Sequence, residues 1–143
     1  MTALTGMRGD VDSGADVFGR VCFTCHVAGE IGSNMGPNLS DAGKRLSRLE
    51  IADSVVHPNA KVDPKYYMVN LSTRSGDAFT GYVESEEEKT VTLRMGAEMT
   101  QKIEKRSITT RETVKSSAMP DGLAATISGQ DFVDLLEFLA AQK

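Results

Sequence analysis

The sequence predicts an α+β protein that is mainly helical, with a small antiparallel β-meander inserted between its helical segments. Apolar residues recur at helical spacing towards both ends of the chain, and they alternate with polar residues in the middle. Turn-forming residues separate the alternating runs. At 143 residues the chain is long enough for one domain, residues 1–143, carrying a β-rich insertion over residues 66–115.

The first predicted helix leads into the two cysteines. Phe18, Val21, Cys22 and Cys25 recur at helical spacing. The cysteine pair is therefore expected near the end of this helix rather than at its start.

Two later helices begin at capping boxes. Ser47-Arg48-Leu49-Glu50 opens a short helix that Pro58 ends. Ser128-Gly129-Gln130-Asp131 opens the closing helix, whose leucine and phenylalanine side chains form one apolar stripe. Asp134 and Glu137 in this helix are expected to face water.

The alternating pattern in the middle of the chain predicts about four strands between residue 66 and about residue 108. The turns between them are Arg74-Ser75-Gly76-Asp77, Glu86-Glu87-Glu88-Lys89 and Gly96-Ala97. The acidic turn is expected to be a solvated hairpin tip.

Charge and hydropathy exclude several classes of protein. Sixteen basic against twenty acidic residues give a net charge of -4, which argues against a nucleic-acid-binding surface. No apolar run approaches the roughly 20 residues of a transmembrane helix. The first residues lack the basic stretch and apolar run of a secretory signal, so we expect a mature chain or a piece of a longer one.

Both cysteines of the chain fall in one pentapeptide, Cys22-Phe23-Thr24-Cys25-His26. Two cysteines with two residues between them and a histidine directly after are the attachment motif for a c-type haem. Each thiol forms a thioether with one haem vinyl group, and the histidine becomes an axial ligand of the iron. The sequence therefore predicts one covalent haem c, bound through Cys22 and Cys25 and ligated by His26.

Two other chemistries use such cysteine pairs. A redox-active dithiol places the pair at the start of a helix, just after a strand, which the helical spacing upstream of Cys22 does not favour. A zinc site needs a fourth ligand, and His57 is the only other histidine. Both readings are less favoured than haem attachment.

At both ends, the chain resembles the class I c-type cytochromes. The resemblance is carried by Gly14 and Phe18 before the haem motif, by Gly36-Pro37-Asn38-Leu39, by Met119-Pro120, and by the closing helix. More narrowly, His57-Pro58-Asn59-Ala60 and Met119-Pro120-Asp121-Gly122-Leu123 resemble the haem-binding module appended to large secreted bacterial dehydrogenase-like proteins.

The resemblance implies a cytochrome c fold of three to five helices around the haem, with the first and last helices crossing near Gly14. It also implies that Pro37 offers its carbonyl to the proximal histidine, that Leu39 lies at the haem, and that Arg45 approaches a propionate. A surface role for Arg45 is about as plausible, given the basic residues nearby.

The second axial ligand is expected to be Met119. Among the seven methionines, Met119 lies in an irregular segment before the closing helix, and a loop can present a thioether to iron. Met95 and Met99 are on predicted strands and are expected in the hairpin core. His57 is a less favoured alternative, because it ends a helix where a surface histidine is common.

An iron with ligands on both faces suits one-electron transfer better than substrate chemistry, and no catalytic residue is expected. We therefore expect a periplasmic or secreted electron carrier that is not an enzyme. Its expected partners are redox proteins: a dehydrogenase or cytochrome donor and an oxidase or reductase acceptor. The segment Lys102 to Lys115 has five basic and two acidic residues. It is a candidate docking patch for an acidic partner, and a solvated edge strand protected by its charges is an equally favoured interpretation. An alternative is a haem-based gas sensor or peroxidase-like enzyme with an open sixth site, and a third is a tethered relay within a larger enzyme.

Overall fold

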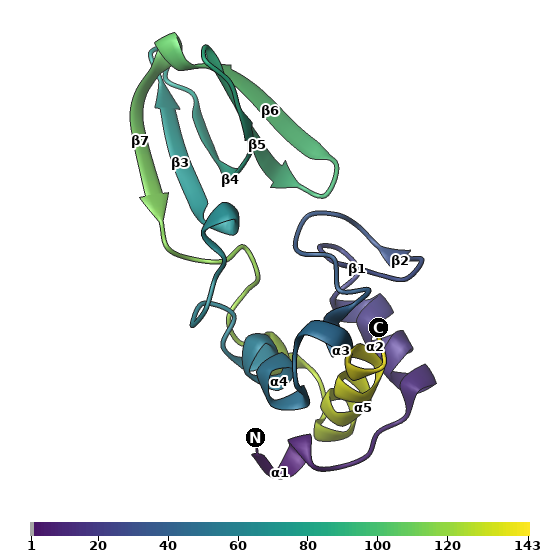
Figure 1. The fold of residues 1–143 in the computed structure, drawn as a ribbon. Helices are drawn as coiled ribbons and strands as arrows, with labels where there is room; N and C mark the ends of the chain where they lie inside the picture. Colours follow the sequence, from purple (N-terminus) through teal and green to yellow (C-terminus); the bar gives the residue numbers. More distant parts are fainter. Residues whose placement is uncertain (1) are drawn as a thin grey trace. The chain divides into compact units, whose positions relative to one another are not determined.

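The structure is a computed structural model that describes residues 2–143, and the chain divides into two compact units (Figure 1). We call Met1–Ala60 together with Pro120–Lys143 the helical unit, and Lys61–Met119 the sheet unit. Each unit has its own set of buried apolar side chains.

The helical unit contains the α-helices, a short hairpin and one 3-10 helix. In chain order these are α1 (Thr2–Thr5), α2 (Val11–Val21), β1 (Val27–Ala28), β2 (Ile31–Gly32), α3 (Ala42–Arg45), α4 (Arg48–Val56), η3 (Leu123–Thr126) and α5 (Gly129–Ala140).

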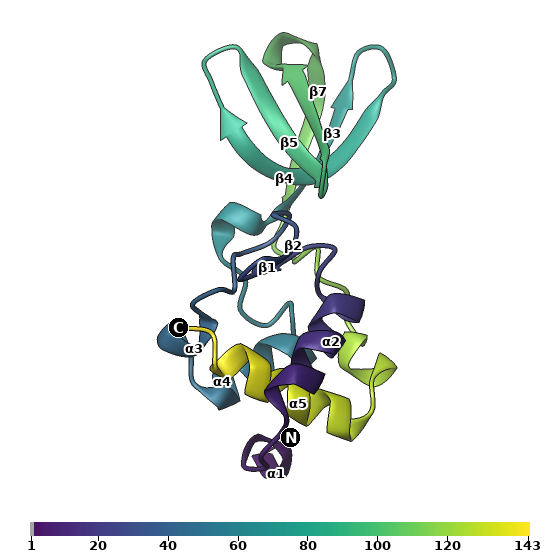
Figure 2. The same cartoon turned by 90° about the vertical axis from the view of Figure 1, so that its right-hand side faces the viewer.

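Helices α2 and α5 cross (Figure 2), and Gly14 lies where their backbones meet. A Cβ on Gly14 would lie 2.0 Å from the carbonyl oxygen of Asp134, so any larger residue would force the two backbones apart. One turn further along α2, the rings of Phe18 and Phe138 have centroids 5.5 Å apart. The expected crossing near Gly14 is therefore present, and it forms the centre of the helical unit's core.

Caps fix where the longer helices begin, and both predicted capping boxes are confirmed. At α4 the Ser47 hydroxyl accepts the N–H of Glu50 at 3.3 Å, and the Glu50 carboxylate accepts the N–H of Ser47 at 2.8 Å. Ser128 and Asp131 cap each other in the same way at α5. Each cap of this kind contributes about 1 kcal/mol to stability.

The expectation that Asp134 faces water is wrong. Its side chain is only 6% exposed, and its carboxylate accepts the N–H of Asp10 at 2.8 Å and an N–H of the Gln130 amide at 2.9 Å. Because Asp10 is the N-cap of α2, the buried carboxylate also lies at the positive end of that helix dipole. Glu137 is half-buried and accepts the N–H of Gly9 at 3.2 Å.

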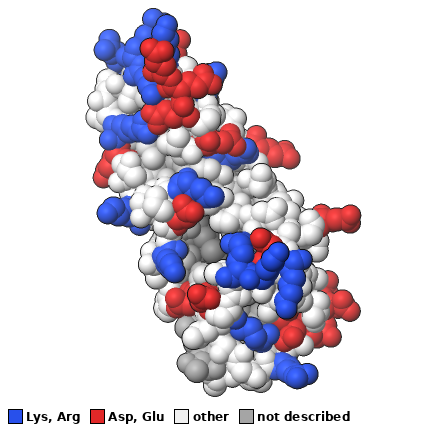
Figure 3. All heavy atoms as spheres, in the orientation of Figure 1, with Lys and Arg blue, Asp and Glu red and all other residues white. Residues whose placement is uncertain are grey.

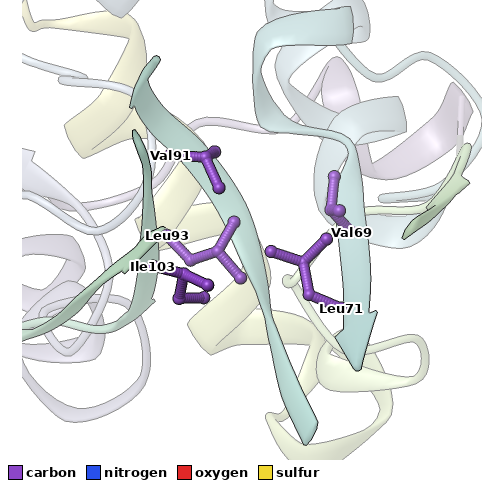
Figure 4. Close-up of a cluster of buried hydrophobic side chains, with 5 residues drawn as sticks. All are labelled: Val69, Leu71, Val91, Leu93 and Ile103. Carbon is purple, nitrogen blue, oxygen red and sulfur yellow. The ribbon is translucent and has the colours of Figure 1, made fainter. Parts of the chain in front are cut away.

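The sheet unit contains five antiparallel strands in the order β6-β5-β4-β3-β7. Its elements are η1 (Pro64–Tyr66), β3 (Met68–Thr73), β4 (Ala78–Glu86), β5 (Thr90–Gly96), β6 (Met99–Glu104), η2 (Lys105–Ser107) and β7 (Ile108–Val114). Register shifts interrupt the pairing of three strand pairs, and such irregularities increase the twist of a sheet. Side chains from β3, β5 and β6 point toward one another on the inner face (Figure 4) and form the core: Val69, Leu71, Val91, Leu93 and Ile103.

The prediction of a mainly helical cytochrome c fold is wrong. The five-stranded antiparallel sheet dominates the fold, and the five α-helices of the described residues are short, from 4 to 12 residues. The prediction of four strands also missed β7. This strand comes after β6 in the chain but pairs with β3 at the opposite edge of the sheet. Residues 109–113 of β7 are exposed, so this strand lacks the alternation of apolar and polar residues that reveals a half-buried strand.

Among residues 2–143, no helix combines the length and apolar character needed to cross a membrane.

Candidate functional site

The two cysteines and the histidine lie in a tight turn directly after α2. Cys22 caps the C-terminal end of this helix, as its spacing predicts, and its N–H donates to the carbonyl of Phe18 at 2.9 Å. The N–H groups of Cys25 and His26 then both donate to the Cys22 carbonyl, at 3.2 and 3.0 Å. We call Cys22–His26 the attachment turn. It presents two free, half-buried thiols one turn apart.

The imidazole of His26 is held by the segment that follows the hairpin. Its Nδ1 lies 2.7 Å from the carbonyl oxygen of Pro37, so the hydrogen bond expected between these two residues is present. Because a carbonyl oxygen can only accept, Nδ1 carries the proton and Nε2 keeps the lone pair that can ligate a metal. A Cβ on Gly36 would lie 2.8 Å from Cε1 of the ring, so glycine allows the backbone to lie against the imidazole.

Burial keeps this group of side chains uncharged. Burial, with a smaller contribution from Cys25, raises the pKa of the Cys22 thiol to about 11, and burial also raises the pKa of Cys25. Burial lowers the pKa of His26, and the hydrogen bond to Pro37 partly opposes this shift. The site therefore offers two neutral thiols and a neutral imidazole near pH 7.

These observations weigh against a redox-active dithiol. Such a pair needs a thiolate, which is stabilised at the positive N-terminal end of a helix. Cys22 lies instead at the C-terminal end of α2, where carbonyl oxygens disfavour negative charge.

The alternative hypothesis of a zinc site is also not supported, because it lacks enough ligands. Within the part of the chain that the structure describes, no group of three or more His, Cys, Asp or Glu side chains could hold a metal ion. His57 caps the C-terminal end of α4 and is exposed.

Two other residues expected at the haem belong to the helical unit. The N–H of Leu39 donates to the carbonyl of Val27 at 2.7 Å, which ties the Pro37 segment to the hairpin. Arg45 forms an ion pair with Asp41, Nε to Oδ1, at 2.8 Å and also donates to the carbonyl of Asn38 at 3.1 Å. Its guanidinium group therefore has partners within the protein, and its approach to a propionate stays a prediction.

Met119 is the last residue of the sheet unit. It lies in irregular backbone between β7 and η3, is half-buried, and donates its N–H to the hydroxyl of Ser117 at 3.0 Å. Its role as a ligand stays a prediction.

The expectation that Met99 is in the hairpin core is wrong, because its side chain is 59% exposed, whereas Met95 packs against the core.

The segment Lys102 to Lys115 is not the simple basic patch that its composition suggests. Lys105 and Arg111 both pair with Glu86, at 2.8 and 2.9 Å, and Arg106 pairs with Glu104 at 2.8 Å. Figure 3 accordingly shows acidic side chains beside basic ones at the upper end of the molecule. Glu86 is exposed, as expected for the acidic turn, but its ion pairs also join β4 to η2 and β7.

A shallow hollow of about 200 Å³ lies in the sheet unit, between the turn that joins β3 and β4 and the end of β6. Its polar side chains already bond one another. The Ser75 hydroxyl lies 2.9 Å from both the Thr73 hydroxyl and the Asp77 carboxylate. The hollow therefore points to no particular ligand.

Sequence reasoning missed Ser33, which contacts the attachment turn. Its hydroxyl donates to the carbonyl groups of Phe23 and Thr24, and its N–H donates to the carbonyl of His26. The available signal in the sequence was weak: Ser33 directly follows a glycine, Gly32, which in the structure has a φ of 110°, a conformation that favours glycine.

No protein-family model matches this chain, and no curated protein matches it. The resemblance to class I c-type cytochromes, and to the haem module of secreted dehydrogenase-like proteins, is therefore corrected. A five-stranded sheet dominates the fold, helices are few and short, and no family match supports that assignment. What supports a function is the geometry of the attachment turn.

Proposed function

We propose that this protein binds one haem covalently through Cys22 and Cys25, with His26 as an axial ligand, and transfers single electrons. The observation that carries the proposal is the attachment turn itself. Two free thiols stand one turn apart, beside a neutral imidazole whose Nδ1 is fixed by Pro37. This donor set fits a c-type haem, because it offers two thiols for two vinyl groups and one nitrogen for iron.

Each residue of the turn has a defined role in this proposal. The thiols of Cys22 and Cys25 each add across a vinyl double bond, so that sulfur bonds to one carbon and the thiol hydrogen moves to the other. No oxidant is needed, because the thiol hydrogen stays in the product and no electrons leave the thiol or the vinyl group. The hydrogen bond to Pro37 orients the His26 ring and increases its basicity as a ligand.

The bound group supplies a one-electron Fe(III)/Fe(II) couple. We propose Met119 as the second axial ligand, supported by its place in irregular backbone and by the half-buried position of the residue. A thioether ligand favours the ferrous state and would fill the sixth position, which suits electron transfer better than substrate chemistry. A periplasmic or secreted location and redox-protein partners belong to the same proposal.

The first experiment is production of the chain in a bacterial periplasm together with haem-attachment machinery. We expect haem that stays with the polypeptide under denaturing conditions, and its loss in the Cys22→Ala/Cys25→Ala double variant. Wild-type protein without covalent haem would refute the proposal.

Axial ligation is tested with matched pairs of variants. His26→Ala should alter the spectrum, while His57→Ala, which removes an exposed histidine, should not. Met119→Ala should abolish the weak long-wavelength sulfur-to-iron charge-transfer band, while Met99→Ala should retain it. Rapid binding of carbon monoxide to the ferrous wild-type protein would contradict a filled sixth site and would favour a gas sensor or a peroxidase-like enzyme.

A further inference from the structure

The attachment turn contains backbone carbonyl groups that find no hydrogen-bond donor within helix α2. The last carbonyls of a helix have no partner within the helix, and α2 ends at Val21. The Cys22 carbonyl is satisfied inside the turn by the N–H groups of Cys25 and His26. The carbonyl groups of residues 23 to 26 need other donors or water.

The chain supplies these donors by folding back. The hairpin of β1 and β2 reverses direction at Gly29 and Glu30, and β2 ends at Gly32. Gly29 and Gly32 have positive φ angles of 61° and 110°. A Cβ on Gly32 would lie 1.8 Å from the carbonyl oxygen of His26, so only glycine lets the returning strand pass this close. The residue that follows, Ser33, is thereby placed against the attachment turn.

Ser33 reaches three of the four carbonyl groups. Its N–H donates to the His26 carbonyl at 3.1 Å, and its hydroxyl lies within hydrogen-bond distance of the carbonyl oxygens of Phe23, at 3.2 Å, and Thr24. The fourth carbonyl, that of Cys25, accepts the N–H of Gly36. A hydroxyl has one hydrogen, so Ser33 shares it between the two carbonyls or alternates between them.

We infer that Ser33 is a positioning residue for haem attachment, whose hydroxyl fixes the two residues between the cysteines so that both thiols meet their vinyl groups. The inference rests on the proposed function. Once one thioether has formed, the second reaction is intramolecular, and its rate depends on how closely the remaining thiol is held to its target. A looser turn therefore leaves more chains with a single thioether.

The substitution series separates the hydroxyl from the size of the side chain. Ser33→Ala and Ser33→Val remove the donor, whereas Ser33→Thr keeps it, and threonine and valine have nearly the same shape. The matched control is Ser40→Ala, because the Ser40 hydroxyl accepts the N–H of Gly29 at 2.9 Å. That variant perturbs the same hairpin without touching the carbonyl groups of the attachment turn.

Singly and doubly attached chains can be counted by mass. Residues 21–44 form one tryptic peptide, between Arg20 and Lys44, which contains both cysteines. After alkylation of free thiols under denaturing conditions, a haem peptide with one thioether carries one alkyl group, and a peptide with two carries none. We expect the singly attached fraction to rise about fivefold in Ser33→Ala and Ser33→Val, as the loss of one ordinary hydrogen bond implies. Ser33→Thr and Ser40→Ala should match the wild type.

Hydrogen exchange in the haem-free chain gives an independent readout. In Ser33→Ala the amides of Cys25 and His26 should exchange faster, while the amides of α5 should be unchanged, which shows that the unit remains folded.

A singly attached fraction in Ser33→Ala equal to that of the wild type would overturn the role of Ser33 and leave the proposed function intact. An equal rise in Ser40→Ala would also overturn it, because hairpin stability would then be the cause. Wild-type chains without covalent haem would remove the proposed function, and this inference with it.

Discussion

The helical unit and the sheet unit differ in what they leave at the surface. Of the six large apolar side chains that are exposed among the described residues, five belong to the helical unit. Two of them, Phe23 and Ile31, lie in or near the attachment turn and are 44% and 37% exposed. The core residues of the sheet unit, by contrast, are at most 4% exposed. The sheet unit thus completes its core with its own side chains, and the helical unit keeps apolar surface beside its reactive groups.

The two units also differ in charge. The helical unit has six basic and eleven acidic residues, a net charge of -5, whereas the sheet unit has ten and nine, a net charge of +1. Several charges of the sheet unit pair with one another across its strands. Because the charges in these pairs neutralise one another, a cluster of basic residues in the sequence, such as Lys102 to Lys115, is a poor guide to the surface charge that a partner meets.

Truncating a core side chain should destabilise the protein most, and it tests whether the two units unfold separately. Leu135→Ala in α5 and Leu93→Ala in β5 each remove a side chain that is at most 1% exposed, and each should cost about 2–5 kcal/mol of stability. Hydrogen exchange should show lost protection in α2 and α5 for the first variant and in the five strands for the second. Covalent haem should decrease only for Leu135→Ala. Equal loss of protection in both units for either variant would mean that they unfold together, and the comparison would fail.

A smaller effect is expected from Gly36→Ala, which tests how closely the backbone packs against the His26 ring in the helical unit. The new Cβ would lie 2.8 Å from Cε1 of His26, so the imidazole must move, at a cost of about 1–3 kcal/mol. We expect a weakened bond between His26 and Pro37, seen as a changed spectrum of the haem-loaded protein and faster loss of axial ligation on denaturation. Gly129→Ala is the control, because its Cβ meets no atom within 4 Å. An unchanged spectrum in Gly36→Ala would show that the ring has room to move without consequence.

The sheet unit should respond to acid through Glu86. Hydrogen bonds from Arg111 and Lys105 lower the pKa of Glu86 from 4.5 to about 2. Because the pKa is lower in the folded state, the ionised carboxylate stabilises the sheet above about pH 4.5, and this contribution is lost as the pH falls towards 2. The group is largely exposed and screened by solvent, so each pair contributes at most about 1 kcal/mol.

Glu86→Gln tests this contribution. The variant should be less stable than the wild type at pH 7 and nearly equal to it at pH 2, as measured by denaturant unfolding of the strands. Glu87→Gln, a change at the neighbouring acidic residue, should leave the difference in stability between pH 7 and pH 2 the same as in the wild type. If stability changes with pH in the same way in Glu86→Gln and in the wild type, the ion pairs of Glu86 with Lys105 and Arg111 are not formed in solution.

Local signals in the sequence predicted local structure well. The capping boxes at Ser47 and Ser128 and the turn at Gly76 all involve residues close in the chain. The hydrogen bond between His26 and Pro37 was expected from the resemblance to the class I cytochromes and not from a local signal. What sequence reasoning missed depends on distant partners. Asp134 is buried because it bonds Asp10, 124 residues away.

The missed features of the sheet have the same origin. Glu86 reads as part of an acidic turn, and its partner Arg111 lies 25 residues further along the chain. Strand β7 is an edge strand that exposes residues on both faces, so neither helical nor alternating periodicity reveals it. The helical periodicity near both ends was correctly recognised, but periodicity alone did not reveal that the sheet would dominate the fold.

Arg45→Gln should have the smallest effect, and it distinguishes a surface role from a role at the haem. The Arg45 side chain is 46% exposed and pairs with Asp41 four residues earlier, so stability should change by about 0.5 kcal/mol or less. If Asp41 is its main partner, the reduction potential of the haem-loaded protein should also stay within error of the wild type, and Asp41→Asn should give the same small loss of stability. A marked shift in potential in Arg45→Gln but not in Asp41→Asn would instead place the guanidinium group beside a propionate, because a positive charge close to the iron changes the relative stability of its two oxidation states.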